Sequence, residues 1–311
     1  MTMALSSVEQ RVLRSRRHHV LAITLAPLLG FAAAVWLLWG RAVGVEEVLL
    51  LAGMWTASGL AGTVGFHRLF AHRSFRARPA VRIGLAILGS MAGQGPVIYW
   101  AALHREHHQY SDRPGDPHSP HLHDQTLRGR LAGAWHSHIG WMFSHRLPNS
   151  ARYTPDLLED KALVRVNNLY FVWLLLGLAI PTVVGGLWRG SLLGAFYGFL
   201  WGGLARLFIG EHLIWSVNSL CHLYGTRPHR VLDHSANNVW LSVFTFGESL
   251  HNNHHAFPSS AIFGLSWWQP DPGAWLIRGL EKLGLVWHVK KPSPQTLEAR
   301  RLRRRAGAPA G

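Results

Sequence analysis

Four long runs without charged side chains constrain this chain more than any other feature. A helix needs about 20 apolar residues to cross the hydrocarbon core of a bilayer. Three of the runs reach or nearly reach that length, and the fourth is short because Arg206 follows it. We therefore predict an all-α integral membrane protein with four transmembrane helices, at residues 20–40, 48–66, 166–188 and 190–205.

A fifth apolar run, residues 83–103, has a Gln-Gly-Pro sequence in its middle. Proline removes a backbone donor and glycine weakens a helix, so this run is a poor transmembrane helix. We predict an interfacial helix there instead. Residues 1–291 are predicted to form a single domain, and residues 292–311 a basic, disordered tail.

The arginines indicate how the chain lies in the membrane. Cytoplasmic loops of membrane proteins carry an excess of Lys and Arg. Arginines precede the first run (11–17), follow the second (68–82) and fill the tail (300–305), whereas few lie in the remaining short connections. With four spans, this distribution predicts a multi-pass protein whose two termini and 104–165 segment are cytoplasmic.

The chain has 31 Lys and Arg against 16 Asp and Glu, a formal net charge of +15. Such a charge could indicate nucleic acid. The apolar runs instead favour anionic membrane lipids as the partner of the basic loops, so no nucleic-acid partner is predicted. Cys221 is the only cysteine in the sequence, which excludes an intrachain disulfide bond.

Three clusters of histidines follow apolar runs on the predicted cytoplasmic side. They read HRLFAH at 67–72, HREHH at 104–108 and HNNHH at 251–255. Residues at i, i+3 and i+4 share one face of a helix, so the three histidines in each of the last two clusters can point at one place. His67 and His72 are five apart, about 140° around an ideal α-helix, and can meet only if the helix changes or ends between them.

Imidazole is a ligand of zinc, copper, iron and nickel. The three clusters contain eight histidines, too many for one ion and suited to two. His222 is a ninth candidate, and Asn218, four residues before it on the same helix face, could reach a metal through a bridging water. The other twelve histidines are assigned by default to the surface or the core: His18, His19, His118, His121, His123, His136, His138, His145, His212, His229, His234 and His288.

The chain resembles a membrane-bound fatty acyl desaturase of the stearoyl-CoA type over about residues 48–260. HRLFAH, HREHHQYSD, DPHSPH, HSHIGW, WSVNSLCHLYGTRP and HNNHHAFP occur in the family's order. The resemblance implies four transmembrane helices and a cytosolic helical cap that holds two irons over a bent acyl tunnel. It also implies that the metal ligands are His67, His72, His104, His107, His108, His222, His251, His254 and His255, with Asn218 acting through water.

The family's tunnel is bent by a Gln and a Trp six residues apart, and Gln94 and Trp100 have that spacing. Trp215 matches a further aromatic residue of the tunnel. Without the resemblance, Gln94 would be a polar group in an interfacial helix, and both tryptophans could belong to the aromatic belt at membrane interfaces. Carboxylates orient metal-binding imidazoles by accepting their second N–H, and the candidates for that role are Glu106, Asp112, Asp116, Asp233 and Glu248.

The activity that the resemblance implies is O₂-dependent desaturation of a saturated long-chain acyl substrate. The match at Gln94 and Trp100 implies a cis Δ9 double bond in a chain of about 16–18 carbons. Ala102-Leu103 stand where animal members have an Arg-Asp pair whose Arg helps to hold coenzyme A. Acyl-CoA, acyl-lipid and acyl-carrier protein therefore remain open as the substrate form. No HPGG heme motif is present, so a separate donor such as ferredoxin, a cytochrome b5-like protein or a flavin reductase must supply electrons.

Two other functions compete with desaturation. A related di-iron lipid hydroxylase shares the histidine clusters but inserts oxygen, and the WSVNSLCH setting of Asn218 and His222 favours the desaturase. A metal transporter would place His, Asp or Glu within its spans. The four predicted spans contain none of these residues, which argues against transport.

Overall fold

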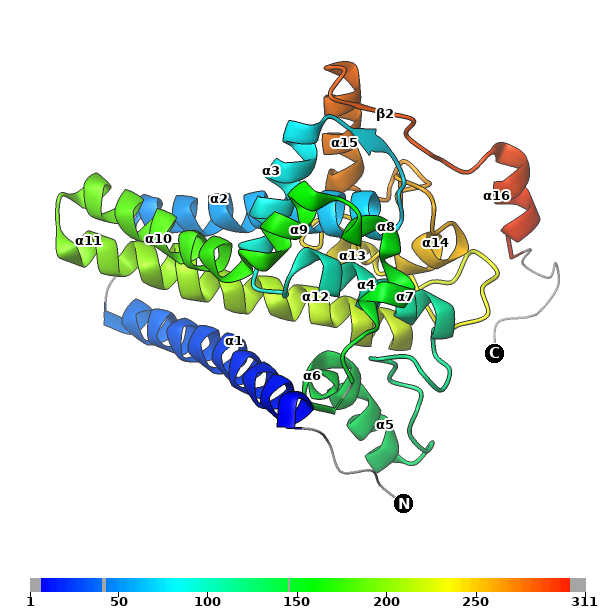
Figure 1. Cartoon of the computed structure of the whole chain (residues 1–311), viewed down its shortest axis with the longest axis horizontal. Helices are drawn as coiled ribbons and strands as arrows, with labels where there is room; N and C mark the ends of the chain where they lie inside the picture. The colour runs from blue at the N-terminus through cyan, green and yellow to red at the C-terminus, as the bar shows by residue number, and fades with distance from the viewer. Residues whose placement is uncertain (1–6, 41–42, 145, 303–311) are drawn as a thin grey trace.

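The computed structural model describes residues 7–40, 43–144 and 146–302. Long helices run side by side and form a bundle, and shorter helices and loops gather into a cap at one end of it (Figure 1). Residues 1–6 of the predicted domain lie outside the described residues.

Among the described residues, four helical segments are long and apolar enough to cross a membrane. The first, Arg14–Leu38, lies in α1 (Ser7–Gly40), and the third is α10 (Tyr170–Arg189). The second and fourth, Val45–Ala71 and Leu192–Leu223, each include a π-helical stretch. Their parts are α2 (Val45–Ala61) and η1 (Gly62–Ala71), and α11 (Leu192–Tyr197), η3 (Gly198–Ala205) and α12 (Arg206–Leu223). The predicted all-α fold with four transmembrane helices is confirmed.

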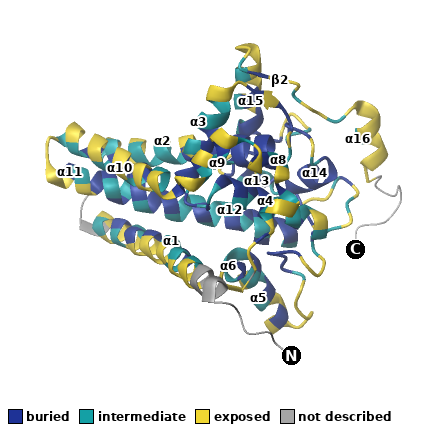
Figure 2. Cartoon of the chain, in the orientation of Figure 1, coloured by how far each residue is buried: buried dark blue, intermediate teal, exposed yellow. Residues whose placement is uncertain are grey.

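The outer faces of the bundle are apolar. Large hydrophobic side chains on α1 and α10 are exposed, among them Leu29 at 68% and Leu187 at 78%. Figure 2 shows exposed residues along α1, α10 and α11, whereas α12 between them is mostly buried or half-buried. Apolar surface of this extent is unfavourable in water and fits the hydrocarbon of a bilayer.

The fourth span is longer than the sequence predicts. The prediction ends it at 205 because Arg206 is charged, and that boundary is wrong. The Arg206 side chain is buried, and its guanidinium donates to the carbonyls of Met91 (2.6 Å), Gly177 (2.8 Å) and Gly202 (3.2 Å). Hydrogen bonds offset much of the cost of burying a polar group, so the helix continues past this residue.

The longer fourth span contains ionisable residues that the predicted span lacks. Leu192–Leu223 includes Glu211, His212 and His222. The sequence argument against a metal transporter relied on spans free of such residues, so its premise is wrong. Transport has to be judged from the site and from the relatives of the chain.

The predicted single helix over 83–103 is two helices. α3 (Pro79–Ser90) and α4 (Val97–Tyr110) are separated by a turn. Gly93 and Gly95 have φ angles of +83° and +93°, left-handed values that glycine adopts without steric cost. The turn therefore ends one helix and lets the next leave in a new direction.

The cap consists of the elements outside the spans. A two-stranded antiparallel sheet joins the segment after the second span, β1 (Arg76–Ala77), to the C-terminal part, β2 (Val286–Trp287). The cap helices are α3, α4, α5 (Leu127–Trp135), η2 (His136–Gly140), α6 (Trp141–Ser144), α7 (Ser150–Tyr153), α8 (Pro155–Leu158), α9 (Lys161–Asn168), α13 (Val239–Ser242), α14 (His251–Ala256), α15 (Pro272–Lys282) and α16 (Pro294–Arg300).

Helix α16 lies within the segment 292–311, which the sequence predicts to be a disordered tail. Ser293 caps the helix, because its Oγ accepts a backbone N–H at 3.2 Å. Arg300 Nη1 donates to the Ala256 carbonyl at 2.5 Å and fixes the helix to α14. The start of the segment is therefore helical, and its residues 303–311 lie outside the described residues.

Candidate metal centre

Nine histidines from four elements gather at the cap ends of the second and fourth spans. They lie on or next to η1, α4, α14 and the last turn of α12. They form two groups, and in each group the candidate ligand atoms lie within 4.8 Å of one another. The first group is His67, His72, His104, His108 and His254, and the second is His107, His222, His251 and His255. These are the nine histidines that the sequence predicts as ligands.

The π-helix η1 brings His67 and His72 together. In an ideal α-helix these residues would point about 140° apart. In a π-helix the backbone hydrogen bond joins residues five apart, and the His72 N–H donates to the His67 carbonyl at 3.0 Å. The two ring centroids are 4.9 Å apart. The change of helix that the five-residue spacing requires is present.

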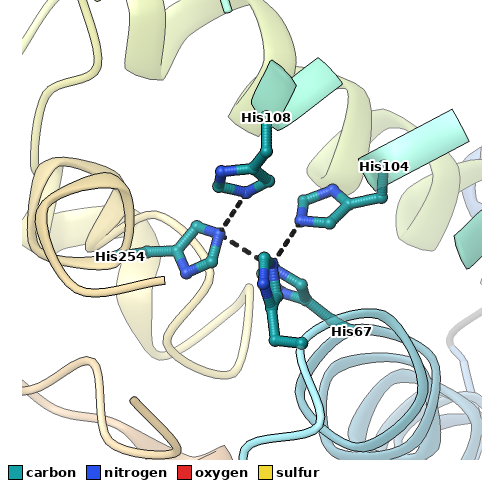
Figure 3. A group of neighbouring side chains, drawn as sticks. His67, His104, His108 and His254 are labelled. Atoms are coloured by element: carbon teal, nitrogen blue, oxygen red, sulfur yellow. Dashed lines mark hydrogen bonds between the residues drawn. The ribbon is translucent and has the colours of Figure 1, made fainter. Parts of the chain in front are cut away.

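In the first group the Nε2 atoms face one another, as Figure 3 shows for the four labelled histidines. His254 Nε2 lies 3.0 Å from His67 Nε2 and 2.8 Å from His108 Nε2. His72 Nε2 lies 2.7 Å from His104 Nε2. Two nitrogen ligands that bind one ion at about 2.1 Å with an angle near 90° are about 3 Å apart. The first group therefore has the spacing of neighbouring ligands on one metal ion.

The second group has similar spacing. His251 Nε2 lies 3.0 Å from His222 Nε2, and His107 Nε2 lies 3.4 Å from His255 Nε2. All four histidines are buried. This group could hold a second ion.

Carboxylates accept hydrogen bonds from the Nδ1 atoms of four of these histidines. The pairs are His222 with Asp112 (2.9 Å), His255 with Asp233 (2.9 Å), His107 with Asp116 (3.0 Å) and His67 with Glu248. Each contact holds the proton on Nδ1 and leaves the Nε2 lone pair for a metal. Four of the five acids that the sequence proposes for this role therefore contact a histidine of the groups, and Glu106 is half-buried on α4.

Burial keeps most of these imidazoles neutral. It lowers the pKa well below the ordinary value, with a further contribution from neighbouring histidines, for His72, His104, His108, His251 and His254. Burial also lowers the pKa of His255 to about 4, although Asp233 acts in the opposite direction. For His107, burial lowers the pKa, but Asp116 and two further aspartates together raise it above the ordinary value. Neutral imidazole is the form that binds metal.

The donor set fits a pair of metal ions. Because Asp112 holds the proton of His222 on Nδ1, the Nε2 lone pair of His222 faces the Nε2 atom of His251 at 3.0 Å. A cation between two such nitrogens turns a weak or repulsive contact into two attractive ones. Four or five nitrogen ligands per ion suit first-row transition metals, iron among them.

An apolar cavity of about 390 Å³ reaches the first group at His104. Its lining also includes Gln94, Trp100, Trp215 and Asn218. Trp100 Nε1 donates to Gln94 Oε1 at 3.1 Å, and the Trp100 ring stacks on His104 with centroids 5.1 Å apart. The three residues predicted for the tunnel and the predicted water-binding Asn218 therefore line one cavity beside the histidines.

Two arginines fix the elements that carry the histidines, and the sequence analysis missed both. Arg105 donates to the Ala71 carbonyl (2.8 Å) and to Asp156 (2.6 Å), which joins α4 to the end of η1. Arg68 is fully buried and pairs with Asp271 at 2.8 Å. Each arginine directly follows the first histidine of its cluster, a repeated His-Arg pair that was the available signal.

His118, assigned by default to the surface or core, lies at the site. With His107 and Asp116 it forms a further set of potential ligand atoms, and its ring centroid is 4.4 Å from that of His107. This set shares His107 with the second group, so it is an extension of that group. His145, another default assignment, lies outside the described residues.

The fold and the two histidine groups define a membrane protein with a candidate two-metal centre beside an apolar cavity. Residues 47–290 match the model of the fatty acid desaturase family. The chain belongs to this family and is an oxidoreductase. The names of three relatives, an acetylenase and two desaturases, give no support to the hydroxylase or the transporter alternative.

Three relatives illustrate the range of the similarity. The chain is 49% identical over 286 residues to a hex-5-enoyl-[acyl-carrier protein] acetylenase of Moorena producens, covering 91% of this chain and 89% of that protein. It is 40% identical over 245 residues to Delta-9 acyl-lipid desaturase 1 of Arabidopsis thaliana, covering 77% and 74%. It is 37% identical over 263 residues to an sn-1 stearoyl-lipid 9-desaturase of Synechocystis sp., covering 83% and 74%.

Proposed function

We propose that this protein is an O₂-dependent fatty acyl desaturase that introduces a cis Δ9 double bond into a saturated long-chain acyl substrate. The observation that carries the proposal is the apolar cavity that reaches His104, with Gln94 and Trp100 in its wall. An unactivated methylene offers no polar handle, so the walls of a cavity must hold the chain in register with the metals. The names of the two desaturase relatives reported above support the Δ9 position.

Two irons held by the nine histidines, one of them also through a water on Asn218, are the proposed cofactors. Iron bound there would supply, with O₂, the oxidant that removes two hydrogens from adjacent carbons. Four electrons and four protons convert O₂ to two waters: two of each come from the acyl chain, and two electrons from a separate donor with two protons from solvent. The buried histidines and the apolar wall keep bulk water away from the reacting carbons.

The substrate form and the side of the membrane are also proposals. The names of the acyl-lipid relatives support a membrane lipid, and the name of the acetylenase relative supports an acyl-carrier protein. The Ala102-Leu103 pair argues against coenzyme A. The arginine distribution supports a cytoplasmic cap with both termini on the same side. A ferredoxin, a cytochrome b5-like protein or a flavin reductase is the proposed electron donor.

Expression in a desaturase-deficient host tests the activity. We expect a new monounsaturated fatty acid whose double bond mass spectrometry locates at Δ9, and purified protein that contains two irons. His255→Ala should abolish the new fatty acid and the binding of two irons. His123→Ala should leave both properties unchanged, because it changes an exposed cap residue outside the two histidine groups. A double bond formed mainly at another position would refute the Δ9 proposal and leave desaturation standing.

Trp100→Ala tests the role of the cavity wall. Loss of the indole removes the hydrogen bond to Gln94 and the contact with His104. A chain that slides by one methylene then loses only about 0.8 kcal/mol of apolar burial, too little to fix one register. We expect a lower rate and double bonds at more than one position, measured by the same lipid analysis. Wild-type rate and position in this variant would show that the wall does not set the register.

A second candidate is formation of a triple bond in a short acyl chain on acyl-carrier protein. The 49% identity to an acetylenase favours it. The host experiment separates the candidates, because alkynes and short chains are distinguished from Δ9 alkenes by mass.

A further inference from the structure

Glu211 on α12 is a buried acid in the wall of the apolar cavity. Its side chain is in the cavity lining and the residue is only 2% exposed. Among the described residues, no group makes a hydrogen bond with its Oε1. Nothing in the proposed metal centre uses this carboxyl, which lies about two helical turns before Asn218 on the same helix, or about 10 Å along its axis.

The neighbours of Glu211 have other partners or keep the space open. Arg206, one turn earlier, directs its donors to three backbone carbonyls. The Tyr170 hydroxyl accepts the Gly95 N–H at 3.2 Å and makes no hydrogen bond with Glu211 Oε1. At Gly93, a Cβ would lie 3.0 Å from Glu211 Oε1, so the absence of a side chain there leaves room for the carboxyl.

A carboxyl in this position discriminates between chains that fill the cavity. A plain hydrocarbon displaces water from the carboxyl and offers no hydrogen bond in return, which is unfavourable. A chain that carries a hydroxyl at the same depth restores the hydrogen bond. Sites built to bond a substrate hydroxyl reject the analogue that lacks it far more strongly than apolar pockets reject a missing methylene.

We propose that Glu211 is a specificity-determining residue that selects acyl chains bearing a hydrogen-bond donor, such as a hydroxyl group, about 10 Å along α12 from Asn218. This inference rests on the proposed function, because it takes the cavity as the acyl site. It goes beyond that function by assigning the cavity a polar subsite. The competing explanation is that Glu211 only balances the charge of Arg206.

The test compares stearic acid with a series of hydroxystearic acids in which the hydroxyl moves along the chain. The acids are supplied in pairs to cells that express the protein, and the ratio of oxidised products is measured. We expect the wild type to prefer one hydroxy isomer, and Glu211→Leu to lower that preference at least tenfold. Glu211→Gln keeps a hydrogen-bond acceptor and should retain the preference, which a role limited to balancing charge would not require.

His212→Leu is the matched control. It also replaces a polar residue of α12 by leucine, but His212 contacts His138 at 3.0 Å and is outside the cavity lining. The product ratio of this variant should equal that of the wild type. If Glu211→Leu does not accumulate, Glu211→Met provides an apolar side chain of similar length.

Three results would overturn the proposal: a wild type that prefers stearic acid over every isomer, an unchanged ratio in the apolar variants, or loss of the preference in Glu211→Gln. If the wild type oxidises no acid at all, the proposed function fails instead. Ligand-induced shifts in the unfolding temperature of purified protein, measured with the same acids, then decide the inference. A hydroxy-acid preference that Glu211→Leu abolishes supports it, and one that this variant retains overturns it.

Discussion

Asp112 illustrates how single side chains order the centre. Its Oδ2 accepts from His222 Nδ1 and from the His234 N–H, and its Oδ1 accepts from the Ser119 hydroxyl at 2.6 Å. Burial alone would raise its pKa, but the hydrogen bond from His222 helps to hold the pKa below the ordinary value. One carboxylate therefore fixes the ring orientation of a candidate ligand and joins two loops of the cap to the end of α12.

Asp233→Asn should weaken metal binding through His255. Asn can present its NH₂ group to Nδ1, so the imidazole loses its fixed orientation and its tautomer. Losses of carboxylates that orient metal-bound histidines commonly cost 10- to 100-fold in metal affinity or activity, and we expect a loss in this range. Metal content at limiting iron and desaturation rate are the measurements.

Asp124→Asn is the control for this change. Asp124 and Asp233 each accept the backbone N–H two residues further on, at 3.0 and 2.9 Å, but only Asp233 contacts a histidine of the two groups. Equal metal content in the two variants would contradict the role assigned to Asp233.

The sequence shows which histidines can share a helix face, but it does not show which acid pairs with which histidine. The i, i+3, i+4 pattern of HREHH and HNNHH follows from helix geometry, so it is visible without a structure. Asp112, Asp116 and Asp233 lie in irregular segments after α4 and α12, where no period relates sequence to direction. The five acids could be named, but their pairing with particular histidines depends on tertiary contacts.

At the scale of elements, the π-helix η1 is the part on which the centre depends. It occupies the end of the second span, and nine of its ten residues, from Thr63 to Ala71, are buried. π-helical turns are rare and occur frequently at functional sites. The sequence indicates that the helix must change near His67 but cannot show how, because ending the helix would also satisfy the spacing.

Deletion of Val64 tests this element. Removing one residue from a π-helix allows the α-helical hydrogen bonds to re-form, which turns His67 and His72 apart again. We expect helicity by far-UV circular dichroism to be unchanged and bound metal to be lost. Val64→Ala keeps the chain length and should retain metal. Full metal content in the deletion variant would mean that the π-helix is not required.

The two mispredicted helix boundaries have different causes. The charge of Arg206 predicts a helix end, but carbonyls from α10 and from the residue after α3 satisfy its donors. In the run 83–103 the Gln-Gly-Pro sequence marks a weak point, but only the φ angles of Gly93 and Gly95 show that the chain turns there. Local sequence does not reveal the partners of Arg206 or the direction of this turn.

At the scale of the whole molecule, the structure separates two ends with different chemistry. The cap and the described start of α1 lie at one end, and the connection between α10 and α11 lies at the other (Figure 1). The four spans and this division agree with the arginine pattern. The side of the membrane that each end faces is the remaining prediction.

Cysteine labelling tests the orientation in a Cys221→Ala background, which is suitable because Cys221 is buried. Leu192 is 91% exposed at the end far from the cap, and His123 is exposed within the cap. A membrane-impermeant maleimide should label Leu192→Cys on intact cells and His123→Cys only after permeabilisation. The reverse pattern would invert the proposed topology.

The strand pair β1–β2 has a consequence for how the protein is made. β2 closes on the segment that follows His72, and His254 meets His67 across 187 residues of sequence. On the ribosome, the first two spans therefore leave the exit tunnel long before their partners exist. Metal insertion must follow the synthesis of α14, and a nascent chain arrested before that helix would enter the bilayer with six of the nine histidines.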